Sequence, residues 1–467
     1  MNSADSTKKR KVECPDDTAQ LTAADEGSMV DIIAQMRSEM NDMKSSHLLS
    51  KSRIDELENK CEVLETKCSS LERSIGILTK ESKWEYSVSD IHRGYWIDKG
   101  YSDDYADDME ELIEEIKSLC SQLRSGKYTS FITLGGHENG LLLDNDNDVL
   151  LPHWEEFANA LQLYQSTDVS EVFSIDAIQL TPSIMDLLTP ALMGKLIKCI
   201  SFDNNELDDN VREGIEFAVE SIRSIQGLTE FNWSSNHISS ERDAQYLVDS
   251  VISHPSIDAI QFTDCFRDLC GYKILCQLLA SGNYKQIIFN HNFRGTGGRT
   301  EISDYIATNP PLDKLILSGN QLNDDDIQLI VRSLKHNTNL RHLRLEHNNI
   351  TEVGKAALIK LVYDTTSLNS MADCNHTCCI DSISYGDMPN PNLSMESPEK
   401  KRARKIYHLL SERNKELSNI QHLNSEFDDE EEDSMKLVPK ILESIHSYSP
   451  PPIILESIHS YSPPPIW

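Results

Sequence analysis

Two interleaved columns of apolar residues run through the N-terminal part of the chain. From Ile33 to Leu78 the columns alternate at steps of three and four residues, which is the a/d pattern of a heptad repeat. From Leu57 onward every d position is leucine, and the a positions are isoleucine or cysteine. The pattern predicts a coiled coil over 29–80 and favours a parallel homodimer. A single amphipathic helix folded back on its own chain is the alternative.

A longer periodicity governs the middle of the chain. The pattern of Leu312, Leu315, Leu317 and Asn320 recurs 28 residues later as Leu340, Leu343, Leu345 and Asn348. Weaker copies begin at 169, 197, 228, 257, 284 and 368, so successive copies are 27–31 residues apart. Each copy opens with alternating apolar residues, typical of a short strand, and closes with apolar residues of helical period. These repeats predict stacked strand–turn–helix units joined by right-handed crossovers.

The motif L-x-x-L-x-L-x-x-N-x-L in these copies resembles the leucine-rich repeat, and its length is similar to that of the ribonuclease-inhibitor-like class. The resemblance covers about 169–378. It implies an α/β solenoid of horseshoe shape, with parallel strands on the concave side and helices on the convex side. The asparagine lies just past each strand, where its amide can satisfy backbone groups that the turn leaves unpaired.

The rest of the sequence divides by composition. Residues 1–28 are predicted to be a disordered arm. Residues 81–168 are expected to form a junction and an N-terminal cap before the repeats at 169–379. A linker at 380–398, a basic helix at 399–425 and an acidic, proline-containing tail at 426–467 are expected to follow. Two identical 13-residue segments, at 441–453 and 454–466, end the tail and suggest no function.

Charge argues against nucleic-acid binding. The chain has 44 basic and 76 acidic residues, a net charge of −32, which would repel phosphates. A basic-region zipper is excluded too, because residues 37–53 carry four basic residues together with Glu39 and Asp42. We therefore expect neither DNA nor RNA as a partner.

The cellular location is expected to be intracellular. No apolar stretch of membrane-spanning length and no apolar signal segment is found, so no membrane association is expected. The 11 cysteines then indicate reduced thiols. A compact basic cluster at Lys8, Lys9, Arg10 and Lys11 resembles a nuclear localisation signal, so the expected location is nuclear or nucleocytoplasmic. A solvated charge run is the alternative.

Three sequence features were weighed as sites for chemistry. Asp144, Asp146, Asp148 and Glu155 have the spacing of a calcium loop, but a valine stands where the loop needs glycine. Cys374, His376, Cys378 and Cys379 could ligate zinc, but no second ligand pair exists. The glycine-rich run at 294–298 matches no phosphate-binding loop. We therefore predict no catalytic, cofactor or metal site, and no enzyme.

The strongest functional prediction concerns residues that flank the strand leucines. Their side chains are expected on the concave face, where they form a polar surface of mixed charge suited to another protein. They are Glu230, Asn232, Ser234, Gln261, Thr263, Gln286, Asn290, Lys314, Ser318, His342, Arg344 and Glu346.

The sequence as a whole predicts a non-enzymatic scaffold. The coiled coil would pair two horseshoes, and each concave face would bind a protein whose identity the sequence does not reveal. The alternative is a small-GTPase regulator, because Ran GTPase-activating proteins are similar in having such repeats followed by an acidic stretch. No catalytic arginine can be placed for that alternative.

Overall fold

The computed structural model describes residues 34–41, 84–126, 130–135, 141–144, 147–165, 171–207, 211–266, 270–282, 284–381, 390–416 and 418–427, with isolated positions at 44, 51, 53, 60, 67, 68, 383 and 441. The chain forms two units, 1–85 and 86–467. In the first unit every described residue before 84 is helical. The arm with Lys8–Lys11, most of the predicted coiled coil and most of the 426–467 tail lie outside the described residues.

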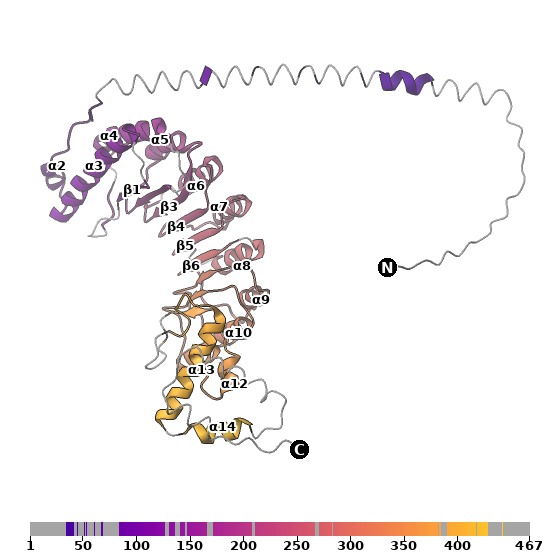
Figure 1. Ribbon diagram of the computed structural model, residues 1–467. Helices are drawn as coiled ribbons and strands as arrows, with labels where there is room; N and C mark the ends of the chain where they lie inside the picture. Colours follow the sequence, from indigo (N-terminus) through magenta and orange to yellow (C-terminus); the bar gives the residue numbers. More distant parts are fainter. Residues whose placement is uncertain are drawn as a thin grey trace, which may run out of the picture. The chain divides into compact units, whose positions relative to one another are not determined.

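The second unit is built on one parallel sheet. Its nine strands, counted over the described residues, lie in sequence order and each pairs with the next. They are β1 (Phe131–Gly135), β2 (Glu171–Asp176), β3 (Ile197–Asp203), β4 (Glu230–Ser234), β5 (Ala259–Thr263), β6 (Gln286–Asn290), β7 (Lys314–Ile316), β8 (His342–Arg344) and β9 (Cys379–Ile380). The sheet is open, as the predicted solenoid requires (Figure 1).

A helix follows each of the first eight strands. These helices are α4 (Asn147–Leu163), α5 (Pro182–Leu192), α6 (Val211–Ser224), α7 (Glu241–Ser253), α8 (Gly271–Ser281), α9 (Glu301–Ala307), α10 (Asp324–Leu334) and α11 (Glu352–Val362). Helices α2 (Arg93–Asp98) and α3 (Asp103–Arg124) precede the sheet. Helix α12 (Leu368–Ala372) precedes β9, and α13 (Pro398–Lys415) and α14 (Asn419–Phe427) follow it. This alternation confirms the predicted α/β leucine-rich-repeat solenoid. No helix among these described segments is long and apolar enough to span a membrane.

The core lies between the sheet and the helices α5–α11, which cover one side of it (Figure 1). Residues alternate between inward and outward along each strand, and the inward ones stack in columns. One such column, all 0% exposed, is Phe231, Ile260, Ile287, Leu315 and Leu343. Strands pack about 4.8 Å apart and helices about 8–10 Å apart, so the stack bends with the sheet on its concave side.

Inside each turn after a strand lies a ladder of polar side chains, which we call the asparagine ladder: Asn205, Asn236, Cys265, Asn292, Asn320 and Asn348. The Asn320 Oδ1 accepts hydrogen bonds from the backbone N–H groups of Asn292 (2.8 Å) and Phe293 (3.2 Å). Its Nδ2 donates to the Phe289 carbonyl at 2.6 Å. In one repeat Cys265 stands in place of the asparagine. Its thiol donates to the Trp233 carbonyl oxygen, which lies 3.0 Å from the sulfur. The predicted role is confirmed with one addition: most of the satisfied groups belong to the preceding repeat, and Asn348 also donates to the Leu345 carbonyl of its own repeat at 2.8 Å.

Helix α8 begins in tight contact with this ladder. A Cβ added at Gly271 would lie 1.9 Å from the Asn292 carbonyl oxygen. The backbone fixes the position of a Cβ, and the oxygen is itself a backbone atom, so no rotamer change can relieve the clash. We therefore expect Gly271→Ala to lower the free energy of unfolding by about 1–3 kcal/mol, the range typical of overpacked sites. Urea unfolding followed by circular dichroism measures this.

Lys273→Ala is the matched control in the same helix. It removes an exposed ion pair with Glu241, so the expected change is under about 1 kcal/mol. Equal stability of the Gly271→Ala protein and the wild type would contradict the close approach.

The two ends of the repeat region differ from the sequence prediction. Leu368 and Met371, expected to open the last copy, lie in α12, and the last strand is β9. Their spacing of three residues fits one face of a helix as well as a strand motif, and Ser367 caps that helix by accepting from the Ser370 N–H at 2.9 Å. At the other end β1 pairs with β2, so the sheet already begins within the segment expected as the cap.

Helix α13 closes the last repeat with two buried lysines. Lys405 is 0% exposed, and its Nζ donates to the carbonyls of Val362 (2.6 Å) and Asn375 (3.0 Å). The Lys401 Nζ donates to the Asn392 carbonyl at 2.9 Å. Asn392 lies in the segment expected as a linker, and its Nδ2 donates to the Cys378 carbonyl at 2.7 Å. Residues 390–416 therefore pack on the end of the solenoid.

Candidate functional site

The outward side chains of the strands form what we call the open face. The strand register arranges them in rows that run across the sheet. The first row is Glu230, Ala259, Gln286, Lys314 and His342, and the second is Asn232, Gln261, Ile288, Ile316 and Arg344. A third row begins with Ser234, Thr263 and Asn290. The 12 residues predicted from the sequence therefore lie in these rows or, for Ser318 and Glu346, just beyond the ends of β7 and β8.

Accessibility varies along this face. Ser234 and Ser318 are buried, at 3% and 6% exposed, whereas the other ten predicted residues are at least partly exposed. The prediction omitted two residues of the second row, Ile288 and Ile316. Strict alternation could have identified both, because each stands between two inward residues of its strand.

Several polar side chains of the open face are held by neighbouring repeats. The Gln261 Nε2 donates to the Ser234 Oγ at 3.1 Å. The Asn290 Oδ1 accepts from the Ser318 N–H at 2.9 Å. These bonds reduce the freedom of the side chains and so reduce the entropy lost when a partner binds.

Charge is distributed unevenly over the open face. Arg344 is already paired, with Asp381 at 3.1 Å and Glu346 at 4.0 Å. Toward the first strands, burial raises the pKa of the Asp203 carboxyl, and a hydrogen bond with Ser235 opposes that shift. The face thus carries an acidic group, Glu230, on β4 and a basic group, Lys314, on β7, while Asp381 and Glu346 balance the charge of Arg344.

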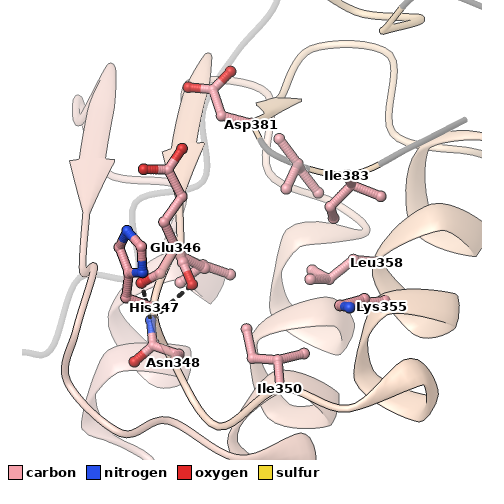
Figure 2. A pocket seen from close by; sticks show the side chains of 10 residues that line it. Glu346, His347, Asn348, Ile350, Lys355, Leu358, Asp381 and Ile383 are labelled. Atoms are coloured by element: carbon pink, nitrogen blue, oxygen red, sulfur yellow. Dashed lines mark hydrogen bonds between the residues drawn. The ribbon is translucent and has the colours of Figure 1, made fainter.

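A pocket of about 330 Å³ lies where the turn after β8 meets α11 and β9 (Figure 2). Leu345, Ile350, Leu358 and Ile380 give it an apolar lining. Its polar lining residues are Glu346, His347, Asn348, Lys355 and Asp381. This combination suits an aliphatic side chain, and among the described lining residues no serine or cysteine accompanies the one imidazole.

The cysteine–histidine cluster does not converge on a common point. The Cys374 sulfur lies 3.2 Å from the Ser370 carbonyl oxygen, and the His376 Nε2 lies 3.0 Å from the Ala372 carbonyl oxygen. Burial raises the pKa of the Cys374 and Cys378 thiols, and raises that of Cys379 to about 11. In the part of the chain that the structure describes, no three His, Cys, Asp or Glu side chains group to hold a metal.

Comparison with protein families identifies the repeat. The Leucine Rich repeat family matches residues 336–358, which contain β8 and the first half of α11. Together with the parallel sheet and its alternating helices, this match supports a leucine-rich-repeat solenoid. The match falls on the copy with the most regular motif, from Leu340 to Ile350. No match is found among curated proteins.

Leucine-rich repeat solenoids generally present their curved face to other proteins and carry no catalytic machinery. The role of the 12 open-face residues in binding stays a prediction, as do the ribonuclease-inhibitor-like subtype and the coiled coil of 29–80.

Proposed function

We propose that this leucine-rich repeat protein is a non-enzymatic scaffold that binds a protein partner on its open face. The observation that carries the proposal is the uncovered side of the sheet. Helices α5–α11 all pack on the other side, and ten of the 12 predicted residues remain accessible. Side chains already fixed by neighbouring repeats favour recognition of a specific surface.

Substitutions at the centre of the open face test this function. Gln261→Arg combined with Gln286→Arg places two long charged side chains on adjacent strands. We expect at least about a tenfold loss of affinity for a partner captured with the full chain, because central contacts dominate interface energies. Binding is measured by titration calorimetry with the purified partner.

The matched control carries arginine on the helical side. Glu220→Arg on α6 changes an exposed residue remote from the open face and should leave the affinity unchanged. If both proteins bind the partner as the wild type does, the open face is not the binding surface.

We further propose that 29–80 pairs two copies of the chain. Met36 and Met40 occupy core positions of the heptad pattern, yet they are 64% and 46% exposed in the single chain. A second helix would bury such side chains, as in coiled coils. Pairing would give a scaffold with two open faces, and the second binding event would gain from a raised effective concentration.

Two substitutions in the d column test the dimer. Leu57→Lys combined with Leu64→Lys puts like charges in the seam, so the full-length protein should sediment as a monomer in analytical ultracentrifugation. Asn59→Lys combined with Thr66→Lys adds the same charges at outer heptad positions and should leave the dimer intact. A monomeric wild type would contradict pairing.

Several expectations stay predictions. They are nuclear import through Lys8–Lys11, the lack of nucleic-acid partners, the lack of enzymatic activity, and the alternative of a regulator similar to Ran GTPase-activating proteins. Stimulated GTP hydrolysis by a small GTPase at catalytic amounts of this protein would favour that alternative.

A further inference from the structure

The first row of the open face holds two opposite charges that are not neutralised by the protein. Glu230 on β4 and Lys314 on β7 make no ion pair within the described part of the chain. Other charges near the strands do pair: Asp258 with Lys285 at 2.6 Å, and Asp313 with Arg341 at 3.3 Å. Glu230 and Lys314 are therefore available to a ligand.

The separation of the two charges follows from the sheet. Glu230 and Lys314 occupy the same row, and β4 and β7 are three strand spacings apart. At about 4.8 Å per spacing this distance is about 14 Å. His342 lies beside Lys314 on the next strand, in the same row.

Apolar surface lies beside the same stretch. Ile288 and Ile316 are neighbours in the second row, on β6 and β7. Ile316 is buried, at 6% exposed, and packs beside Ile288, which is half-buried and offers a shallow apolar contact. Between the charges, the first row holds Ala259 and Gln286, which leave room for a chain to approach.

We propose that the open face binds an extended segment of a partner protein that crosses β4–β7. A basic side chain of the segment lies opposite Glu230, and an acidic side chain lies opposite Lys314. An extended chain rises about 3.3 Å per residue, so 14 Å corresponds to about four residues, and residues four apart point to the same side. An aliphatic side chain between the two charges contacts Ile288.

The occupant is a peptide segment rather than a nucleic acid, because Glu230 and Asp203 would repel phosphates at the acidic end of the face. This inference rests on the proposed function, since it names the chemistry of what the open face recognises. It adds a spacing and a charge order that the proposed function alone does not require.

A displayed library of random ten-residue peptides, selected on the immobilised full-length protein, tests the proposal. Selected peptides should be enriched at least about tenfold in a basic and an acidic residue four positions apart, with an aliphatic residue between them. The double variant Glu230→Gln, Lys314→Gln should lose this charge spacing. The control Glu220→Gln, Lys360→Gln removes the same two charges from helices α6 and α11 and should retain it.

Two outcomes overturn the inference: no enriched spacing with the wild type, or the same spacing with the neutral open-face variant. Circular dichroism verifies that each variant is folded. The proposed function can hold even when this inference fails. If Gln261→Arg with Gln286→Arg weakens partner binding while no peptide spacing is enriched, the open face binds a folded surface, and only this inference fails.

Discussion

Asn320→Ala should lower the free energy of unfolding by about 3 kcal/mol or more. Asn320 is 0% exposed, and its amide satisfies the N–H groups of Asn292 and Phe293 and the carbonyl of Phe289. Alanine leaves these three buried groups without a partner, and each such group costs about 1–3 kcal/mol when water cannot replace the bond. Urea unfolding monitored by circular dichroism measures the loss.

Two control substitutions test whether the loss of stability comes from the buried ladder bonds. Asn349→Ala changes an exposed asparagine in the neighbouring repeat and should alter stability by less than about 0.5 kcal/mol. Asn348→Ala removes a ladder residue that is partly exposed, so water should reduce its effect below that of Asn320→Ala. Equal stability of the Asn320→Ala protein and the wild type would mean that the ladder bonds do not stabilise the fold.

The stability of the wild type relative to Lys405→Met should increase between pH 7 and about pH 10. Burial lowers the pKa of Lys405 to about 7 in the folded protein, whereas the amine in the unfolded chain titrates near 10.5. Between these values the unfolded state binds a proton that the folded state does not, so stability rises with pH. One proton contributes at most about 1.4 kcal/mol per pH unit, or about 4 kcal/mol over the window.

Urea unfolding of both proteins at pH 6, 7, 8, 9 and 10 measures this difference. Below about pH 7 both states of the wild type bind the proton, so the difference should be constant. Lys400→Met replaces an exposed lysine of the same helix and should give a difference that does not vary with pH. The same flat profile for Lys405→Met would show that the buried amine stays charged in the folded protein.

The sequence predicts the central strands well because their alternating apolar residues recur at nearly constant spacing. Strands β2–β8 follow that rhythm. Strand β1 begins 40 residues before β2, and β9 begins 37 residues after β8, so neither fits the repeat length. Helix α12, which precedes β9, has an apolar spacing that also fits a strand motif. Packing against the rest of the solenoid decides whether this segment forms a helix or a strand.

The open face and the C-terminal closure show what sequence reasoning leaves out. Polar residues of the open face were predicted, whereas Ile288 and Ile316 were not, because an apolar residue in a strand is more often part of the core. The sequence predicted a basic helix at 399–425 and gave no sign that two of its lysines are buried. Helical spacing places Lys401 and Lys405 on one face, but their burial depends on carbonyl acceptors up to 43 residues away in the chain.

The asparagine ladder makes the stacking of repeats directional. The backbone N–H groups of the Asn292 and Asn320 turns donate to side chains of the repeat that follows, Asn320 and Asn348. Deleting the first repeats would remove turns whose N–H groups donate to the next repeat. Deleting the last repeats would leave the N–H groups of a new terminal turn without a side-chain acceptor. Gain or loss of repeats over evolution is therefore easier at the amino end, and the carboxyl end needs a dedicated stop.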